Sequence, residues 1–470
     1  MNDDSSVSGN SKVPQPRVVT IVYLLLLAAA VGLFFVIRSI GEDISRAPLE
    51  VGANVGKPHV EPHASALPQV LLALVTVIVT ARVLGLIFQQ LGQPRVIGEV
   101  VAGIVLGPSV LGRLSPETAA FLLPSTVMPM LGVLAQLGVI LYMFLVGLEL
   151  NSELLRSRAH TTVAISHASI VAPFLLGALL ALEVFPHYAP PGVGFTSFAL
   201  FMGVAMAITA FPVLARILTD LGIERTALGV VALSCAAADD VTAWCLLAFV
   251  VGVTQADFYG AAITVGMTAG YIVLMFGFAR RGMVRWLGTA NGTRPSHDVT
   301  AWVLVAVLTS ALLTEAIGIH AIFGAFLLGA IIPHDSDLAR SFRHKLEDVV
   351  SILLLPTFFA FTGARTQIGL LSQPSDWLVC GLIIVVATVG KFGGSVVAGR
   401  LTGLDWRTSA SLGILMNTRG LMELIVLNIG LDMGVISPTL FAMMVLMALV
   451  TTIATTPILR WLQGQGSSGQ

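Results

Sequence analysis

Two adjacent carboxylates stand in the middle of a long apolar segment of this 470-residue chain. Asp239 and Asp240 lie in "SCAAADDVTAW", and the stretches "TALGVVAL" before it and "CLLAFVVGV" after it contain no charge. A central Asp costs about 2.5–3.5 kcal/mol on scales for insertion into a membrane. Neighbouring helix positions point about 100° apart, so the two carboxylates address different partners. This pair predicts an ion or proton site more strongly than two structural salt bridges.

A lysine in another apolar segment offers a partner for one of these aspartates. Lys391 lies in "VVATVGKFGGSVV" and is the only lysine within the apolar segments from residue 67 onward. A lysine near a helix end can extend its ammonium to the membrane surface. Lys391 is at mid-segment beside small residues, so we expect it to pair with an aspartate instead.

Two further apolar segments contain residues that interrupt a helix. In "AMAITAFPVLARIL", Pro212 follows Thr209, and a proline removes a backbone N–H and frees a carbonyl. Such backbone is tolerated at membrane depth only where it is buried or lines a polar cavity. Freed carbonyls, hydroxyls and half-helix ends could hold a small cation, although a simple proline kink stays open as the alternative.

The second interrupted segment is "GILMNTRGLMELIVLN", which places a run of polar residues at mid-membrane. An Arg and a Glu within this run stand four residues apart, so they can pair on one face of a helix. Such a pair can be purely structural, which is the alternative to a role in binding the ion. We therefore expect part of this group to bind a cation and part to support the site. The group consists of Asn417, Thr418, Arg419, Gly420 and Glu423.

The composition of the chain is that of a polytopic membrane protein. Hydrophobic residues make up 56% and charged residues 11%, whereas soluble domains carry about 25% charged residues. The net charge of −1 and the lack of a basic block argue against nucleic acid as a partner. The three cysteines have no metal-site spacing, so we expect no metal cofactor. We also expect the protein to be a transporter and not an enzyme.

The elements that must position these residues are membrane helices of about 20 residues. Fourteen segments qualify: 18–38, 67–88, 96–112, 126–149, 160–182, 195–216, 226–252, 258–279, 299–317, 320–333, 348–366, 377–399, 408–429 and 436–462. Arg and Lys gather in alternate loops, so the positive-inside rule places the C-terminus in the cytoplasm. Segment 18–38 could be a cleaved signal peptide, but its apolar run is long for one and no A-x-A site follows promptly, so we expect an uncleaved anchor. We expect 39–66 to be a linker and 463–470 a disordered tail.

The apolar segments from residue 67 onward contain a weak internal repeat. The stretch "GIVLGP" (103–108) resembles "AFLLGAIIP" (325–333), and "MFLVGLEL" (143–150) resembles "FAFTGART" (359–366). Each pair is seven spans apart, which is an odd number, so the repeats would be inverted in the membrane. Inverted repeats with discontinuous helices are typical of transporters, although packing of small residues can produce similar stretches.

Seven stretches in order give the chain a family resemblance. They are "IGEVVAGIVLGPSVLG", "LYMFLVGLEL", "ITAFPVLARIL", "AAADDV", "HAIFGAFLLGAIIP", "LLLPTFFAFTGART" and "LMNTRGLMELIVLNIG". Together they resemble the monovalent cation:proton antiporter-2 family over residues 67–462. The last stretch is most similar to the plant cation/proton exchangers of that family.

The resemblance implies an all-α sodium/proton-antiporter fold with 13 core helices in two inverted repeats and two crossed broken helices. The helix at 18–38 would be additional to this core. A dimer domain would comprise 67–149 and 299–366, and a moving core domain 160–252 and 377–462. The resemblance also implies a homodimer and elevator-type alternating access.

Residue by residue, the resemblance makes Asp240 the aspartate that binds the cation or the proton and Asp239 the partner of Lys391. Thr209 and the break from Asn417 to Gly420 match the helix crossing. Asp239 stands where many relatives have Asn or Gln, and together with Lys391 it resembles electrogenic sodium/proton members. The plant-like last stretch instead points to exchangers linked to potassium, so the resemblance leaves Na+ and K+ both open.

We expect a secondary transporter that exchanges Na+ or K+ for protons in the inner membrane of a bacterium. A sodium-coupled symporter of an organic anion is one alternative, but Arg419 is the only evident group for a large anion. A non-transporting membrane sensor is another, and it would tolerate loss of the aspartates. A channel is disfavoured because no selectivity-filter repeat occurs.

Overall fold

The computed structural model describes residues 66–149, 159–255, 258–283, 297–333 and 336–464. These residues form helices and their connections, without a strand in the described ranges. Each apolar segment predicted from residue 67 onward is occupied by helix. The predicted anchor at 18–38, the linker and residues 465–470 of the tail lie outside the described residues.

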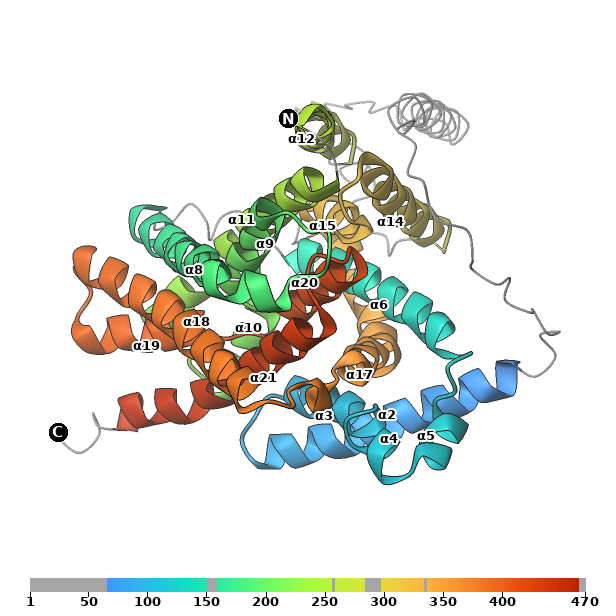
Figure 1. Ribbon diagram of the computed structural model, residues 1–470. Coiled ribbons are helices and arrows are strands. Elements are labelled where there is room, and N and C mark those ends of the chain that lie inside the picture. Colours follow the sequence, from blue (N-terminus) through green and yellow to red (C-terminus); the bar gives the residue numbers. More distant parts are fainter. Residues whose placement is uncertain (1–65, 150–158, 256–257, 284–296, 334–335, 465–470) are drawn as a thin grey trace, which may run out of the picture.

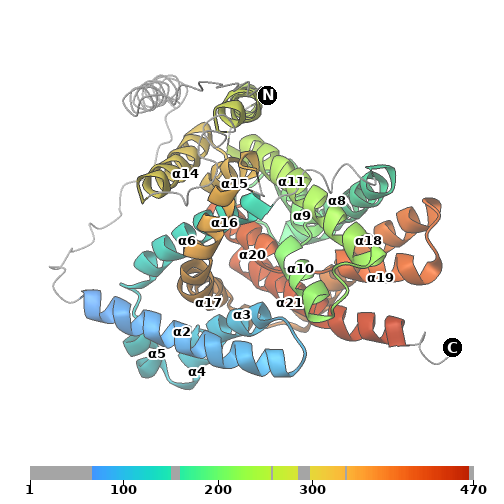
Figure 2. The same ribbon diagram turned by 180° about the vertical axis from the view of Figure 1, so that it is seen from behind.

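The helices are labelled in Figures 1 and 2. They are α2 (Ala66–Gln90), α3 (Arg95–Leu106), α4 (Leu111–Leu114), α5 (Pro116–Leu122), α6 (Met128–Glu149), α8 (Ala159–Tyr188), α9 (Phe195–Ala207), α10 (Phe211–Asp220), α11 (Ala227–Gln255), α12 (Phe258–Leu274), α14 (His297–Ile317), α15 (Ala321–Ile331), α16 (Asp337–Val349), α17 (Leu355–Arg365), α18 (Pro374–Leu401), α19 (Trp406–Met416), α20 (Leu421–Asp432) and α21 (Pro438–Gly464). Wider π-helical turns follow α12 (Met275–Ala279) and precede α17 (Val350–Leu354), and a 3₁₀ turn (Ile368–Leu370) precedes α18.

Within the described ranges, eight helices are long and apolar enough to cross a membrane. A ninth is added if α19 and α20, which are bent by 42° at their break, are taken as one span. The chain is therefore a multi-pass membrane protein.

Several predicted segments have different ends in the structure, and two of them show a physical reason. The segment predicted at 348–366 continues a helix that begins at Asp337, because Ser336 caps this helix by accepting the N–H of Ala339 at 3.2 Å. Its first turns are charged and amphipathic, so a search for continuous apolar residues cannot find them. The segment predicted at 96–112 ends as α3 at Leu106, just before Gly107 and Pro108.

The helices pack as two sets that lie on opposite sides of the molecule (Figures 1 and 2). The first set contains α2, α3, α6, α14, α15 and α17, and the second contains α8 to α11 and α18 to α21. Within the first set, α3 packs on α17 and α6 packs on α15. The internal repeat equates α3 with α15 and α6 with α17, so each of these contacts is the symmetry counterpart of the other.

Small residues allow the helix backbones of the first set to approach closely. A Cβ atom on Gly103 would overlap the backbone of Ala360, and one on Gly147 would overlap the backbone of Phe326. Gly329 meets the backbone of Phe144 in the same way. Close approach through small residues is the usual packing of membrane helices, in which apolar burial alone does not drive association.

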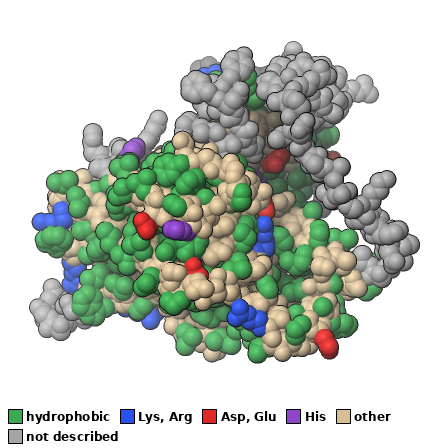
Figure 3. Space-filling view, viewed as in Figure 1, with side chains coloured by type: hydrophobic (Ala, Val, Ile, Leu, Met, Phe, Trp, Pro, Cys, Tyr) green, Lys and Arg blue, Asp and Glu red, His purple; other side chains and the backbone are tan. Residues whose placement is uncertain are grey.

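Apolar stripes mark the outward faces of several helices. On α2 the exposed residues recur every four positions, which places them on one face. Figure 3 shows that hydrophobic side chains dominate the visible surface and that charged ones are scattered. This surface suits contact with lipid. The stripe on α2 consists of Leu67, Leu71, Val75, Val79 and Val83.

One end of α19 illustrates the helix caps outside the spans. The Asp405 carboxylate accepts the backbone N–H of Thr408 at 3.0 Å. Hydrogen bonds from the side chain and backbone of Thr408 hold the pKa of Asp405 below its usual value. The cap therefore fixes where the first half of the broken span α19–α20 begins.

Candidate functional site

The two interrupted segments meet at their breaks. The first break separates α9, which ends at Ala207, from α10, which begins at Phe211 with Pro212 in its first turn. The second break runs from Asn417 to Gly420 between α19 and α20. The N–H of Ala210 donates to the carbonyl oxygen of Thr418 at 3.0 Å. This bond joins the two breaks directly, as the predicted crossing requires.

Buried cations satisfy the last carbonyl groups of α9. Arg419 donates from Nη1 to the oxygen of Ala205 at 3.1 Å and from Nη2 to the oxygen of Met206 at 2.8 Å. Lys391 Nζ donates to the oxygen of Ala207. A helix that ends inside the membrane leaves carbonyls without intrahelical partners and carries partial negative charge there. The positive side chains at this end donate hydrogen bonds to the carbonyls and compensate the partial negative charge.

Arg419 also forms the predicted pair with Glu423. Its Nη1 lies 3.0 Å from Glu423 Oε2, and both side chains are fully buried. Glu423 stands in the first turn of α20, where the positive end of the helix favours a carboxylate. Thr452 on α21 holds the Arg419 backbone by accepting its N–H at 3.0 Å and donating to its carbonyl at 2.7 Å. The structure therefore contains the Arg419–Glu423 pair that the spacing of the two residues predicts.

Asp239 is surrounded by hydroxyl groups. Ser166 Oγ donates to its Oδ1 at 2.6 Å, and Ser169 Oγ and Thr209 Oγ1 donate to its Oδ2 at 2.6 and 2.8 Å. Thr209 also lies 3.4 Å from the oxygen of Met416, so it connects Asp239 to the end of α19. The carboxylate is fully buried, and these bonds replace the water it would have outside the membrane.

The structure brings Lys391 to Asp239, as the sequence predicts. Lys391 Nζ lies 3.5 Å from Asp239 Oδ2, and both side chains are fully buried. This distance exceeds the 2.6–2.8 Å of the hydroxyl bonds to the same carboxylate. The ammonium is thus shared between the carboxylate and the last carbonyl of α9.

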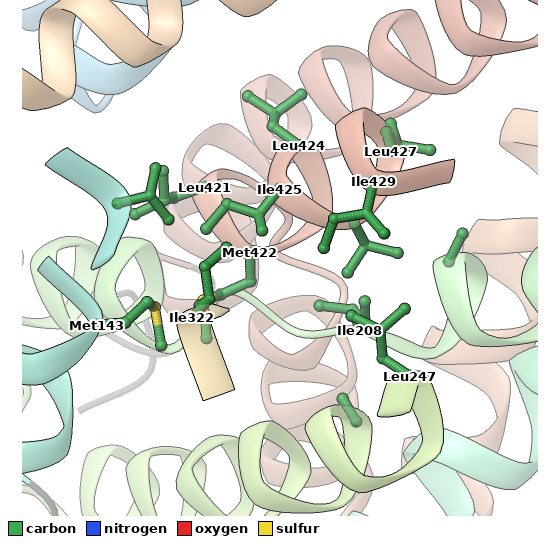
Figure 4. Packing of buried hydrophobic residues seen from close by; sticks show 14 of the residues in the cluster. Met143, Ile208, Leu247, Ile322, Leu421, Met422, Leu424, Ile425, Leu427 and Ile429 are labelled. Atoms are coloured by element: carbon green, nitrogen blue, oxygen red, sulfur yellow. The ribbon is translucent and has the colours of Figure 1, made fainter. Parts of the chain in front are cut away.

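Asp240 has a different environment from its neighbour, as expected for adjacent positions on a helix. It is 2% exposed, and its Oδ1 has no hydrogen-bond partner within the described ranges. It lines a small cavity with Ile208, Ala243, Met422 and Val426. Figure 4 shows Ile208 and Met422 within the apolar cluster around the start of α20. Among the described residues, Asp240 is the one ionisable group that lines this cavity.

The second break carries further oxygens without partners. Asn417 Oδ1 and Thr418 Oγ1 are buried, and neither has a hydrogen-bond partner within the part of the chain that the structure describes. Amide and hydroxyl oxygens are ligands that hard cations accept. Gly420 completes the break, and its carbonyl accepts the N–H of Leu424 at 3.0 Å.

Sequence reasoning missed Ser166, Ser169 and Thr452. The two serines stand three residues apart in "AISHASIV", a spacing that places them on one face of α8. Nothing in that segment says which face meets α11. Threonine is common in membrane helices, where its hydroxyl usually bonds its own backbone, so Thr452 gave no signal either.

A polar cluster connects the two helix sets at one end of the molecule. Arg365 on α17 donates to Asn428 Oδ1 at 3.0 Å and to Asp432 Oδ1 at 2.5 Å, both on α20. Asn428 Nδ2 donates to Thr362 Oγ1 at 2.8 Å. A small cavity lies beside this cluster and is also lined by His320. The cluster ties the second half of the broken span to the first helix set.

Residues 63–462 match a family model described as the transmembrane region of sodium/hydrogen exchangers. The chain is 46% identical over 394 residues to the Na+/H+ antiporter NhaS4 of Synechocystis sp., covering 83% of this chain and 96% of that protein. It is 38% identical over 396 residues to cation/H+ antiporter 15 of Arabidopsis thaliana, covering 84% of this chain and 48% of that protein. It is 33% identical over 384 residues to K+/H+ antiporter 1 of Saccharomyces cerevisiae, covering 79% and 44%.

The chain thus spans nearly all of the cyanobacterial relative and about half the length of the plant and yeast relatives. A solved structure, the sodium proton antiporter MjNhaP1 from Methanocaldococcus jannaschii, matches 86% of this chain and 98% of its own, with a TM-score of 0.61. The identity in that match is 16%, so it supports the fold alone. The predicted antiporter fold is confirmed.

Proposed function

The chain belongs to the sodium/hydrogen exchanger family, and we propose that it exchanges a monovalent cation, Na+ or K+, for protons across a membrane. The observation that carries the proposal is Asp240, a buried carboxylate beside the crossed helix breaks, whose Oδ1 has no hydrogen-bond partner among the described residues. An ionisable group inside a membrane is expensive and marks an ion or proton path.

The identity of the transported cation, Na+ or K+, is a separate part of the proposal. The cyanobacterial relative is named for Na+/H+ antiport and the yeast relative for K+/H+ antiport. Na+ is our first choice for testing, because the chain covers nearly all of the cyanobacterial protein. K+ is the second.

In the proposed reaction, Asp240 holds either a proton or the cation. Asp240, Asn417 and Thr418 each offer a buried oxygen that has no partner in the part of the chain the structure describes, and these three residues would hold the cation with help from Thr209. Asp239 keeps its charge and balances Lys391. The arriving cation competes with the Lys391 ammonium for the negative charge of the two aspartates. Lys391 can yield to the cation because its ion pair with Asp239 is long and its ammonium also bonds the carbonyl oxygen of Ala207.

The accompanying motion is also part of the proposal. We take the second helix set as the moving core and the first set as the static dimer domain of a homodimer. Packing supports this division, because the main helix contacts run within each set. A site carried on the second set would reach both membrane surfaces by an elevator-type movement. We propose a bacterial inner membrane as the location, with the C-terminus in the cytoplasm.

The test uses purified protein in liposomes with an imposed pH gradient and an internal pH dye. Na+, K+ and Li+ are added in turn to wild type, to Asp240→Asn and to Asp337→Asn, an exposed aspartate that serves as the control. We expect cation-dependent proton movement in wild type and Asp337→Asn and none in Asp240→Asn. Full activity of folded Asp240→Asn would overturn the proposed role of Asp240.

The alternatives are outcomes of the same test. A sodium-coupled organic-anion symporter needs a free cationic group, but Arg419 is fully buried and bonds Ala205, Met206 and Glu423. A sensor would show no exchange with any cation. Folded wild-type protein that moves no protons with any of the three cations would overturn the antiport proposal.

A further inference from the structure

We propose that Thr452 on α21 is a positioning residue of the exchange site, whose hydroxyl fixes the shape of the break between α19 and α20 and thereby sets the affinity for the cation. The inference rests on the proposed antiport function and names a residue that this function does not by itself require. Thr452 lies outside both broken spans and outside α11 and α18, which carry Asp239, Asp240 and Lys391.

The hydroxyl of Thr452 makes two bonds to a single residue of the break. Its Oγ1 accepts the N–H of Arg419 at 3.0 Å and donates to the carbonyl oxygen of Arg419 at 2.7 Å. Arg419 stands between the helix that ends at Met416 and the helix that begins at Leu421, so these groups lie where the helical hydrogen-bond pattern is interrupted. Both residues are buried, and a buried backbone group without a partner is costly. One side chain on α21 therefore satisfies the backbone at the centre of the break.

The peptide group that joins Thr418 to Arg419 is held at both of its polar atoms. Its N–H belongs to Arg419 and donates to Thr452, and its carbonyl belongs to Thr418 and accepts the N–H of Ala210 from the first break. A trans peptide group is planar with its N–H and carbonyl pointing opposite ways, so these two bonds fix its orientation. That orientation governs where the side chains of Thr418 and Asn417 lie, and the oxygens of these two residues are proposed cation ligands.

Thr452 differs from neighbouring threonines of α21 in the partner of its hydroxyl. Thr451 Oγ1 donates to the carbonyl oxygen of Met447 at 2.9 Å, and Thr455 Oγ1 donates to that of Thr451 at 3.0 Å. Such bonds to the preceding turn of the same helix are common for a threonine within a helix. A hydroxyl has one proton to donate, and Thr452 donates it to Arg419 in the broken span instead. The hydroxyl of Thr452 therefore supports the break, whereas those of Thr451 and Thr455 bond their own helix.

Thr452 also lies where the two helix sets meet. It lines a small cavity with Arg419 and Gly420, to which α3 of the first set contributes Val96 and Val100. The two bonds of Thr452 stay within the second set, because α19, α20 and α21 all belong to it. The break can therefore keep its shape while α3 changes its position relative to the second set.

The experiment measures the rate of cation–proton exchange in liposomes over a range of Na+, K+ and Li+ concentrations for wild type and Thr452→Val. We expect the cation concentration at half-maximal rate to rise about tenfold, because the break loses the bonds that hold the ligand oxygens in place. The maximal rate should change by less than about twofold, because Asp240, Asn417 and Thr418 are all still present. Thr452→Ser keeps the hydroxyl and should restore the wild-type concentration dependence.

Thr451→Val and Thr455→Val are the matched controls. Each removes a buried hydroxyl from α21, but that hydroxyl bonds its own helix. We expect both controls to keep the wild-type concentration dependence. A Thr452→Val protein that keeps this dependence, or that loses maximal rate without a change in the half-maximal concentration, would overturn the positioning role. A folded Thr452→Ser protein with a tenfold shift would overturn it as well, even if Thr452→Val does not fold.

A second readout separates this inference from the proposed function. If wild type exchanges no cation, the antiport proposal fails, but the deuterium uptake of backbone amides around the break still reports whether Thr452 holds it. Faster uptake in Thr452→Val, and not in Thr452→Ser or Thr451→Val, supports the positioning of the break without transport. Equal uptake in all of these proteins would count against it.

Discussion

At the scale of the residue, the site separates two carboxylates that are adjacent in the chain. Asp239 has three hydroxyl partners and a lysine, whereas Asp240 faces an apolar cavity with one oxygen unpartnered within the described ranges. Their contributions to stability should therefore differ, because removing one member of a buried ion pair leaves the other uncompensated. An unpartnered buried oxygen already carries a desolvation cost.

The two aspartates give a paired prediction. Asp239→Asn should lower the free energy of unfolding by about 3–5 kcal/mol, because it leaves the Lys391 ammonium buried without its counter-charge. Asp240→Asn should change it by less than about 1 kcal/mol, because no ion pair is lost. Thermal unfolding of both variants in detergent checks this. Equal destabilisation by the two substitutions would contradict the different environments.

Arg419 gives a second prediction at this scale. Arg419→Ala removes the donors to the end of α9 and leaves Glu423 alone, so we expect a loss of about 3–5 kcal/mol in unfolding free energy. Arg340→Ala is the control, because Arg340 pairs with Asp337 at 2.6 Å on the surface and should cost at most about 1 kcal/mol. Denaturant titrations in detergent compare the two, and similar losses would argue against Arg419 as a structural support.

At the scale of the element, close helix contact depends on glycines with little space. Gly147 meets Gly329 and the backbone of Phe326 where α6 packs on α15, and α3 and α17 repeat this arrangement. The repeat of the contact explains why similar small-residue stretches recur in the sequence. A glycine on a lipid-facing helix surface is not needed for close helix contact.

A glycine pair tests this contact. Gly147→Ala should lower the free energy of unfolding by about 1–3 kcal/mol, because the added methyl group must separate two backbones. Gly381→Ala on α18 meets open space and should be neutral or stabilise by up to about 1 kcal/mol through its better helix propensity. Thermal unfolding midpoints of the two variants measure this difference in stability. A stable Gly147→Ala protein would mean that α6 and α15 can shift freely.

At the scale of the whole molecule, the two helix sets are joined at one end by the Arg365, Asn428, Asp432 and Thr362 cluster. Arg365 also lies 5.4 Å above the ring of Phe361, which holds its side chain in place on α17. Any movement of the second set against the first must break these contacts. A covalent link across the cluster is therefore a direct test of that movement.

The linked variant is Thr362→Cys/Asn428→Cys in a background whose three cysteines are replaced by alanine. Oxidation should stop cation–proton exchange, and a reducing agent should restore it, because the link fixes α17 to α20. The control pair Ser109→Cys/Thr366→Cys lies within the first set, where Ser109 donates to the Thr366 carbonyl at 2.6 Å, and should keep its rate. Unchanged exchange in the oxidised Thr362/Asn428 pair would rule out relative motion at this point.

The sequence by itself determined much of the fold and of the candidate site. Apolar length predicted the helices from residue 67 onward, because the membrane requires about 20 apolar residues to cross it. Proline and glycine marked the two breaks, since they interrupt a helix wherever it lies. Buried charges were visible as Asp239, Asp240, Lys391, Arg419 and Glu423, because an ionisable residue in an apolar run stands out in any context.

Only the tertiary structure decided which groups meet. Ser166 and Ser169 are ordinary residues in an apolar segment, and their role depends on the face of α8 that is turned to α11. The sharing of Lys391 between Asp239 and Ala207, and the link from Arg365 to α20, join residues more than 60 positions apart. Such contacts depend on the rotation and depth of whole helices, which are set by packing against several neighbours and leave no local pattern in the sequence.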